Sequence, residues 1–434
     1  MKNGISFLII GILLCSLFAC AAPPLKTPQV VRAEVVQSDK PRNLSPNVPS
    51  ADLTELVYSN TAFALSLYRL LSTENPASNL FYSPYSISVA LAMTYAGARG
   101  ETEQQMANTL HFSLPQERLH AAFNALDQQL IALAQGGQGS EAGQGFRLHI
   151  ANALWGQQGF EFLNEFLDTL AQNYGAGLRL VDFSTNPEAA RQVINQWVSD
   201  QTEQKIQNLI PQGALDPLTR LVLTNAIYFN AAWQYPFQKE ATSEEPFFLL
   251  NGEQITVPMM KLNKSLLYAE GTDYQLVSLP YEGGSIEMVV ILPAAEQFEA
   301  LQAKIDPAWL TEALAQRQFQ MVNLSLPKFK VESDFSLVDT LSNLGMPVAF
   351  QPDQADFSGM DGRQDLYIGE VVHKAYVNVD EAGTEAAAAT AVIVGLTAAL
   401  PEQPVIMTVN RPFLFLIRET QSGSVLFIGQ VTQP

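Results

Sequence analysis

Few residues in this chain of 434 have the types and spacing that catalysis needs. The histidines are scattered and form no HExxH motif, no GxxxxGK[ST] phosphate loop occurs, and no GxSxG sequence marks a serine nucleophile. Both cysteines, Cys15 and Cys20, lie near the N-terminus, so the remaining chain has neither a disulfide nor a thiolate metal site. The usual enzyme signatures are missing, which weakens a catalytic interpretation. The four histidines are His111, His120, His149 and His373.

One stretch near the C-terminus, VDEAGTEAAAATAV from Val379 to Val392, combines conflicting conformational preferences. The consecutive alanines Ala386–Ala389 favour a helix, because alanine is the best helix former. Gly383 precedes them, and the β-branched sequence TAVIV that follows favours a strand. Local preference alone does not decide this segment, so the elements around it must be considered.

Helical patterns dominate the first half of the chain. Apolar residues recur at helical spacing from Leu53 to Leu71, and SISVALAMTYAGA predicts a helix that is apolar on all sides and therefore buried. Asn186 and Pro187 supply a cap and a first-turn proline for another helix. After Pro211 the sequence patterns change from those typical of helices to those typical of strands.

Strand and hairpin patterns dominate the second half. LVLTNAIYFNAAW has few polar interruptions and predicts a central strand. FFLLNGEQITV carries Asn251-Gly252 between apolar runs, which is the strongest short hairpin signal, and SLPYEGGSIEMVVILP predicts a second hairpin. Because helices come mostly first and strands mostly later, we predict an α+β fold with antiparallel or mixed sheets rather than a βαβ repeat.

Composition restricts the partners. Hydrophobic residues make up 47% of the chain, enough for a large core, and the formal net charge is −19. This charge argues against binding to nucleic acid and against electrostatic attraction to anionic lipid.

The first twenty residues, MKNGISFLIIGILLCSLFAC, have the length and apolar run of a signal peptide. Leu17-Phe18-Ala19-Cys20 resembles a bacterial lipobox, which predicts lipidation at Cys20; the alternative is ordinary cleavage near Ala21 or Ala22. We predict a flexible linker over residues 21–50 and a folded domain over residues 51–434. The protein would then be exported, as an outer-membrane or periplasmic lipoprotein held only by its lipid anchor, or as an extracellular protein.

Five segments together resemble the serpin family of serine protease inhibitors, in the order found in that family. They are NLFYSPYSISVALAMTYAGARGETEQQM, LTNAIYFNAAWQYPF, LPKFKVESDFSLVDTLSNLGM, VDEAGTEAAAAT and NRPFLFLIRETQSGSVLFIGQV. The resemblance covers the chain from about residue 51 to residue 434. It implies a serpin fold with three β-sheets, about nine helices and an exposed reactive loop near the C-terminus.

The resemblance also implies an activity, that of a monomeric single-use inhibitor rather than an enzyme. A target serine protease attacks the reactive loop and forms a covalent acyl-enzyme. The cut loop then inserts into the large sheet as a new strand and distorts the protease before water releases it. The alternative is a serpin-fold protein that does not inhibit and serves in binding, transport, storage or as a chaperone.

The segment after Val379 has the properties that insertion into a closed sheet requires. Gly383 provides backbone freedom, the alanines are small, and no charge falls on the buried face if Thr384 faces the core and Glu385 faces solvent. Shifting the register by one residue would bury Glu385. The alternative role is a short helix on the alanines, which remains compatible with later insertion. The predicted hinge residues are Glu381, Gly383, Thr384, Glu385, Ala386, Ala387, Ala388, Ala389 and Thr390.

In the family the cleaved bond lies about fourteen residues past the hinge glycine, which here selects the bond between Thr397 and Ala398. A register slip of one residue would make Leu396 the bait. The surrounding VIVGLTAAL is uncharged, so a trypsin-like target is disfavoured, because its acidic pocket requires Arg or Lys. Thr or Ala suits elastase-like or subtilisin-like proteases, whereas Leu396 would suit chymotrypsin-like enzymes.

The resemblance assigns supporting roles to residues elsewhere. It places a polar network at the shutter, where the central strands must part, and a tryptophan, Trp197, where insertion begins. Lys328 and Glu381 match a pair beside the insertion point, which as an exposed pair would contribute roughly 0–1 kcal/mol. Without the resemblance, the polar residues would be interpreted as unrelated buried groups and Trp197 as core. The shutter residues are Ser83, Ser86, Asn225 and His373.

Some serpins use a glycosaminoglycan cofactor that binds a basic helix. The corresponding region here, PQERLHAAFNALDQQLIALAQ, has Arg118 as its only Lys or Arg. We therefore predict no glycosaminoglycan cofactor, and the sequence indicates no other cofactor and no metal site.

Overall fold

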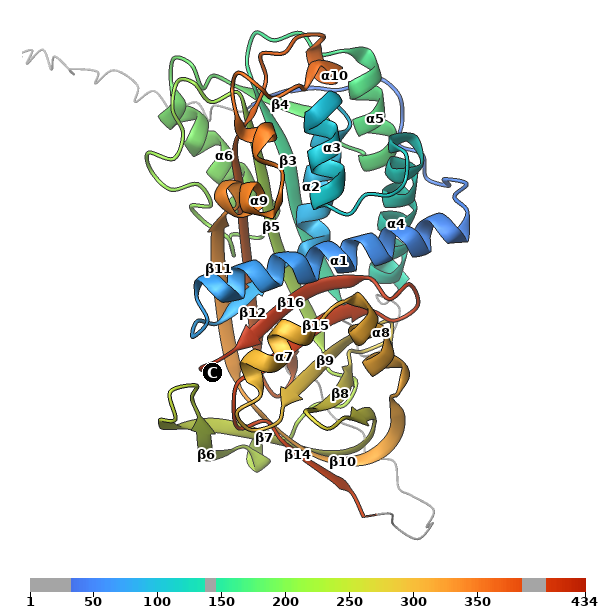
Figure 1. Ribbon diagram of the computed structural model, residues 1–434, viewed down its shortest axis with the longest axis vertical. Helices are drawn as coiled ribbons and strands as arrows, with labels where there is room; N and C mark the ends of the chain where they lie inside the picture. The colour runs from blue at the N-terminus through green and yellow to red at the C-terminus, as the bar shows by residue number, and fades with distance from the viewer. Residues whose placement is uncertain (1–32, 137–145, 385–402) are drawn as a thin grey trace, which may run out of the picture. The chain divides into compact units, whose positions relative to one another are not determined.

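The computed structural model describes residues 33–136, 146–384 and 403–434 (Figure 1). Several predicted residues lie outside these ranges. They are Cys20, the hinge residues from Glu385 to Thr390, and the bait residues Leu396, Thr397 and Ala398.

Ten α-helices occur among the described residues, most of them in the first half of the chain, as the periodicity predicted. The α2 helix is buried on nearly all sides. The predicted cap of α6 is present, since the Asn186 side chain accepts a hydrogen bond from the Ala189 backbone N–H at 3.1 Å. The helices are α1 Ser50–Glu74, α2 Pro84–Tyr95, α3 Gly100–Thr109, α4 Gln116–Gly136, α5 Asn164–Tyr174, α6 Pro187–Gln201, α7 Phe298–Lys304, α8 Pro307–Ala315, α9 Val338–Leu344 and α10 Ser358–Asp361.

One sheet has seven strands in the order β1-β4-β3-β5-β13-β12-β11. Its central strand β5 comes from LVLTNAIYFNAAW and is almost wholly buried, which confirms the prediction of a central strand. The strands are β1 Glu34–Val36, β4 Leu178–Val181, β3 Arg147–Gln157, β5 Leu221–Ala232, β13 Gly383–Thr384, β12 Ile368–Val379 and β11 Phe329–Ser336.

A second sheet has nine strands in the order β14-β10-β7-β8-β9-β15-β16-β2, with β6 paired to β7. Both predicted hairpins are present, as β6–β7 and β8–β9. The strands are β14 Val405–Thr408, β10 Gln318–Pro327, β7 Gln254–Glu270, β8 Tyr274–Pro280, β9 Ile286–Pro293, β15 Phe413–Glu419, β16 Val425–Val431, β2 Leu80–Tyr82 and β6 Ser243–Phe248.

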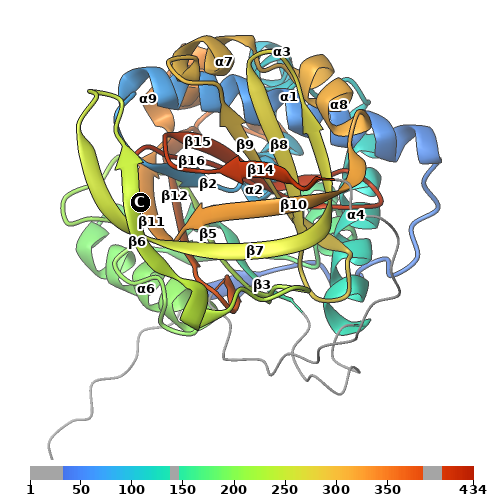
Figure 2. The same ribbon diagram turned by 90° about the horizontal axis from the view of Figure 1, so that it is seen from below.

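The α+β fold class is confirmed, but the described strands form two hydrogen-bonded sheets where three were expected. The reason is the length of β7, which pairs with β6, β10 and β8 along successive parts of its course. Both hairpins therefore belong to one nine-stranded sheet, joined through β7. Figure 2 shows β6, β7, β10 and β14 on the face seen from below.

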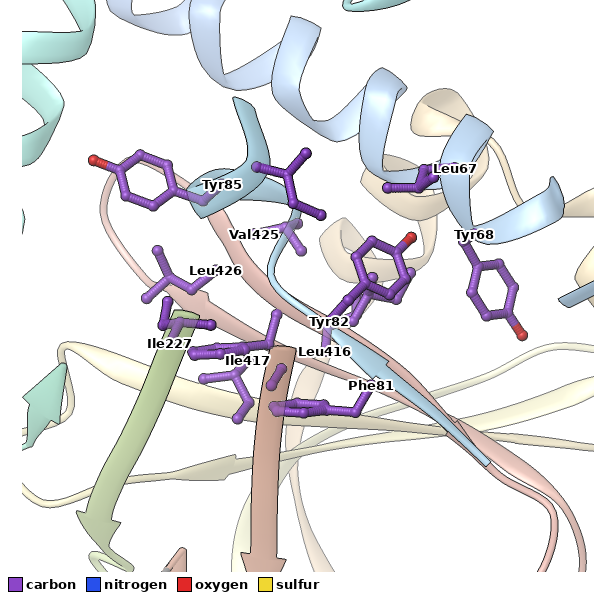
Figure 3. Close-up of a cluster of buried hydrophobic side chains, with 14 of the residues drawn as sticks. Leu67, Tyr68, Phe81, Tyr82, Tyr85, Ile227, Leu416, Ile417, Val425 and Leu426 are labelled. Carbon is purple, nitrogen blue, oxygen red and sulfur yellow. The ribbon is translucent and has the colours of Figure 1, made fainter. Parts of the chain in front are cut away.

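The main core lies where the two sheets and the first two helices meet. Figure 3 shows side chains of α1, β2, β5, β15 and β16 converging there. The buried phenol of Tyr68 donates to the Gln430 side chain at 2.7 Å, and that of Tyr82 donates to the Ala64 carbonyl at 2.7 Å. Each large aromatic therefore keeps a hydrogen-bond partner while burying its ring. Residues of β5 and β12, which are strands of the seven-stranded sheet, also belong to this core.

The predicted linker is wrong over its described part, residues 33–50. Strand β1 pairs antiparallel with β4 at the edge of the seven-stranded sheet. Arg42 donates to Asn124 at 3.0 Å and forms an ion pair with Asp127 at 2.5 Å, and Lys40 pairs with Asp168 at 2.7 Å. The segment is docked because an edge strand and the α4 and α5 side chains satisfy its polar groups. Three paired residues are too short a pattern to stand out in the sequence.

Within the part of the chain that the structure describes, no helix has the length and apolar character of a membrane span.

Candidate functional site

The hinge begins as a strand already seated in the sheet. Strand β13 lies between β5 and β12 and pairs antiparallel with both, Gly383 opposite Ala232 and Thr384 opposite Ala231 and Val379. Beyond it, β5 and β12 pair directly with each other in parallel, from Tyr228 and Tyr376 to Leu221 and Ile368. The boundary between β5 and β12 is named here the β5–β12 seam. At one end of it β13 separates the two strands, and along the rest of it they pair directly with each other.

Gly383 is required by a close approach of two backbones. A Cβ built on this residue would lie 2.2 Å from the Ala231 carbonyl oxygen and 2.7 Å from the Ala232 Cα. No side chain fits at that distance, so glycine permits β13 to enter the gap. The sequence predicted a role in turning; the structure adds a steric reason.

Thr384 faces the core, which is the orientation assumed in the predicted register. Its side chain is fully buried, and its hydroxyl hydrogen-bonds the Tyr281 hydroxyl at 2.8 Å. Tyr281 stacks on Trp233 with ring centroids 4.5 Å apart. The first inserted side chain therefore rests on an aromatic platform that also satisfies its hydroxyl group.

Trp197 does not lie at the hinge. It is on α6, where its ring packs edge-on against Trp155 and under the Arg179 guanidinium. The tryptophan at the hinge is Trp233, whose Nε1 donates to the Asp380 carbonyl at 3.0 Å and whose backbone N–H donates to the Ala382 carbonyl at 2.9 Å. The prediction for Trp197 is wrong in position. A tryptophan ending the LTNAIYFNAAW strand was the available signal for Trp233.

Lys328 and Glu381 form the predicted pair, with Nζ and Oε2 2.8 Å apart. The pair is not simply exposed, because the Glu381 side chain is only 6% accessible. Burial alone would raise the pKa of Glu381, but hydrogen bonds from Lys328 and Thr242 outweigh it and hold that pKa below its usual value. The carboxylate is therefore charged and fixed beside the start of β13.

The four predicted shutter residues come together in one buried network. Asn225 Nδ2 donates to the Ser86 hydroxyl at 2.6 Å, and Asn225 Oδ1 accepts from His373 Nδ1. The Ser83 backbone N–H donates to His373 Nε2 at 3.2 Å, and its hydroxyl donates to the Leu426 carbonyl at 2.7 Å. Their role in strand separation stays a prediction, but the geometry spans the closed seam.

Asn152 belongs to the same network and was missed. Its Oδ1 accepts from Ser86 Oγ at 2.8 Å and from Asn225 Nδ2 at 2.5 Å. It lies on β3 directly opposite Asn225, which in turn lies opposite His373. The three side chains form a row across β3, β5 and β12, named here the shutter row. An asparagine inside the apolar LHIANALW stretch was the signal that could have identified it.

His373 is neutral in this network. Its Nε2 faces a backbone N–H, which can only donate, so the ring proton is on Nδ1. Burial lowers the pKa of His373 to about 3. The contact in which Nε2 accepts from the Ser83 N–H therefore depends on an uncharged imidazole, because a protonated ring would set two donors against each other there.

In its described part, the site consists of the seated strand β13 and the buried polar network beside it. The described residues contain no group of three or more His, Cys, Asp or Glu side chains placed to hold a metal ion. Arg118 is the only Lys or Arg in the region that corresponds to the glycosaminoglycan-binding helix of some serpins. It lies on α4 and forms an ion pair with the buried carboxylate of Asp52 at 2.5 Å. The arrangement therefore has two parts. At one end β13 separates β5 from β12, and further along the hydrogen-bonded side chains of the shutter row join the two strands.

The chain matches the family profile described as Serpin (serine protease inhibitor) over residues 58–434. It belongs to the serpin family. The human leukocyte elastase inhibitor is 41% identical over 391 residues, covering 88% of this chain and all of that protein. The matched family and this relative are both described as protease inhibitors.

Two solved structures show the same fold. The thermophilic serpin tengpin in its native state is 28% identical with a TM-score of 0.80, covering 93% of this chain and all of that one. Human thyroxine-binding globulin complexed with its ligand is 30% identical with a TM-score of 0.77, covering 88% of this chain and 99% of that one. The same fold therefore occurs in a serpin and in a protein named for binding thyroxine, so the fold alone does not decide the function.

Proposed function

We propose that this serpin inhibits a serine protease by suicide-substrate trapping, with insertion of its cleaved loop between β5 and β12. The observation that carries the proposal is β13, whose two residues already occupy that position with antiparallel pairing on both sides. Insertion would extend this pairing along the seam. It would replace one parallel ladder with two antiparallel ladders, which adds backbone hydrogen bonds and supplies the driving force.

The register of β13 specifies where the following residues would lie. Continuing from Thr384, each further residue would pair one position back along both β5 and β12. Six positions on, Thr390 would arrive between Asn225 and His373, which now face each other. A hydroxyl group would then stand where the Asn225–His373 hydrogen bond is broken. This supports the idea that the shutter row is remade rather than only lost.

The same register supports the alternation required for burial. Side chains on one face of a strand recur every second residue, so residues 386, 388, 390, 392 and 394 would share the buried face of Thr384. These positions are Ala, Ala, Thr, Val and Val, all uncharged. Glu385 would lie on the opposite face. The small residues come first, where the strands have just begun to separate.

The chemistry would be performed by the protease. Its serine oxygen attacks the Thr397 carbonyl carbon, the bond to the Ala398 nitrogen breaks, and the new amine leaves with the proton that the serine hydroxyl released. The ester that remains links the protease to the loop. Insertion then carries the acyl-enzyme away before water completes hydrolysis.

We infer an elastase-like or subtilisin-like target, because Thr397 and Ala398 are small and uncharged. The 41% identity to an elastase inhibitor supports this choice. The test is incubation with elastase, subtilisin, chymotrypsin and trypsin, followed by denaturing gels and mass spectrometry. We expect a covalent band at the summed mass with the first two, and release of a C-terminal peptide that begins at Ala398. Cleavage by every protease without such a band would instead favour the non-inhibitory alternative.

We also propose that the protein is an exported lipoprotein modified at Cys20. The apolar leader followed by Leu17-Phe18-Ala19-Cys20 is the supporting feature. Metabolic labelling with a fatty acid and cell fractionation test this proposal. Label on the wild type and none on Cys20→Ser is expected, whereas equal labelling of both would contradict it.

A further inference from the structure

An exposed apolar patch lies on the nine-stranded sheet close to the end of the reactive loop. Phe319 and Met321 on β10 are 74% and 42% exposed, and Ile406 on β14 is 70% exposed. These three residues, named here the β10–β14 patch, are large apolar side chains facing solvent in a protein with a net charge of −19. Clustered exposed apolar residues mark interaction surfaces more often than isolated ones.

Strand pairing places the three side chains on one face. Asn323 of β10 lies opposite Ile406, and Phe319 and Met321 follow at alternate positions on the same strand. The side chains opposite them on β7, Leu267 and Ser265, are uncharged. Neighbouring strands of a sheet are about 4.8 Å apart, and residues two positions apart on one strand are about 6.6 Å apart. The three apolar side chains are therefore close enough to form one continuous patch. Figure 2 shows β7, β10 and β14 side by side on this face.

The patch continues into a concave surface. Phe319 and Leu267 border a cavity of about 330 Å³ that is also lined by Tyr235 and Pro280. Interfaces concentrate their binding energy where a side chain of one partner fills an apolar pocket of the other. The patch therefore has both a flat apolar area and a pocket for a protruding side chain.

Chain length connects this surface to the predicted bait bond. Eight residues separate Ala398 from Ile406, and an extended chain spans at most about 3.6 Å per residue, so the bond lies within roughly 29 Å of the patch. A protease domain of some 230 residues has a radius of gyration of about 17 Å and is about 45 Å wide. A protease bound at the loop is thus within reach of the patch.

We propose that the β10–β14 patch is a second docking surface for the body of the target protease, separate from the bait residues. This inference rests on the proposed function. The contacting partner surface would be apolar, because the three patch residues are apolar and the β7 side chains opposite Phe319 and Met321 are uncharged. The charged residue that lines the cavity, Glu287, is paired with Arg317 and Arg418. The patch would hold the encounter complex while the loop is attacked, lowering its dissociation rate without changing the chemistry.

The test uses the full-length protein with Phe319→Ser, Met321→Ser and Ile406→Ser combined. Reaction rates with elastase or subtilisin are measured over a range of inhibitor concentrations. We expect the half-saturating concentration to rise about tenfold, because truncated contact residues weaken docking. The limiting rate constant should stay unchanged. A synthetic peptide of residues 391–402 serves as a substrate without the patch, and the thermal unfolding midpoint verifies folding.

Leu218→Ser is the matched control. Leu218 is 65% exposed, but it precedes the Leu221 end of β5, whereas the cavity lies beside the Ala232 end; twelve strand residues put about 36 Å between these ends. This variant should behave as wild type. An equal loss in Leu218→Ser would mean that exposed apolar groups act nonspecifically, and would overturn the inference.

The outcomes separate this inference from the proposed function. Normal trapping with an unchanged half-saturating concentration in the triple variant overturns the patch alone. Cleavage without trapping, still weakened in the triple variant, overturns the inhibitor mechanism and supports the docking surface. Faster attack on the variant would mean that the loop itself covers the patch, and loss of a wild-type dimer in sedimentation would mean that a second copy does; both overturn the inference. If no protease cuts the loop, both proposals fall.

Discussion

Two regions of the β5–β12 seam, the hinge end and the shutter row further along it, differ in what lies between the strands. At the hinge end, β13 is already inserted and Thr384 is buried against Tyr281. At the shutter row, β5 and β12 pair directly and Asn225 bonds to His373 across them. Under the proposed mechanism, the first region would receive the inserting loop and the second would oppose it. A seam built in this way can stay closed until cleavage frees the loop, and then open from one end.

A charge at Thr384 should have the largest effect on this comparison. Thr384→Arg would place an unpaired guanidinium in a fully buried position, which costs several kcal/mol, so β13 would leave the seam. We expect covalent trapping to be lost and the loop to be cleaved as an ordinary substrate, as seen on denaturing gels. Thr73→Arg, at an exposed threonine of α1, is the control. Full trapping by Thr384→Arg would show that Thr384 does not remain in the sheet.

Weakening the shutter row should have the next largest effect. Asn225→Ala removes the donors to Ser86 and Asn152 and leaves the buried His373 Nδ1–H without its acceptor, at a cost of roughly 2–4 kcal/mol. We expect faster spontaneous conversion of the uncut protein to an inactive form, followed as loss of trapping during incubation.

Asn195→Ala provides the comparison for that variant. Asn195 is a buried asparagine of α6 that makes two hydrogen bonds to the Ile210 backbone, away from the seam. It should lower the free energy of unfolding without speeding the conversion. Equal conversion rates for the two variants would mean that general stability, rather than the shutter row, keeps the seam closed.

The residues along the seam also show which features could be predicted from the sequence alone and which could not. The helical and strand patterns predicted the α+β class, the central strand and both hairpins, because these depend on local periodicity. Resemblance placed Ser83, Ser86, Asn225 and His373 in one network, but it selected Trp197 where the structure has Trp233. Trp197 lies within a helix and Trp233 directly follows a strand, and only tertiary pairing decides which one meets the hinge.

The remaining gaps have the same physical origin. Asn152 joins the network through its partner on the neighbouring strand, and Glu381 is buried through contacts that are distant in sequence. The docking of residues 33–49 depends on three strand residues and on Arg42 reaching α4. Long-range pairing leaves no periodic trace in a short segment. Roles for the residues beyond Thr384 stay predictions.

Acid should loosen the shutter row by an intermediate amount. The pKa of His373 is lowered to about 3 by burial, against about 6.5 when exposed. Because the folded value is the lower one, its contribution is fully present above about pH 6.5 and is lost as the pH falls toward 3. At pH 5 the loss is about 2 kcal/mol. We expect spontaneous conversion to accelerate below pH 6.5.

His120 makes this prediction specific. It is also buried, with its pKa lowered to about 4, but it lies between α4 and α5 beside Tyr174. His373→Gln should remove most of the pH dependence of conversion, and His120→Gln should leave it in place while reducing the pH dependence of global unfolding. If His120→Gln abolished the acid response instead, the seam would not be the acid-sensitive element.

The smallest effect is expected from the ion pair at the hinge end. Lys328 is partly exposed, so solvent screens its attraction to Glu381, yet the carboxylate is buried and also accepts from Thr242 at 2.8 Å. Lys328→Ala should cost about 1 kcal/mol, more than an exposed pair and less than a buried one. Lys304→Ala, which breaks the more exposed pair with Asp273, is the control and should cost less than half as much.

Because Glu381 precedes β13, the Lys328 variant should also raise the fraction of loop cleaved without trapping, measured as the number of inhibitor molecules consumed per protease. An unchanged ratio with reduced stability would mean that the pair supports the fold but does not hold β13 in the seam.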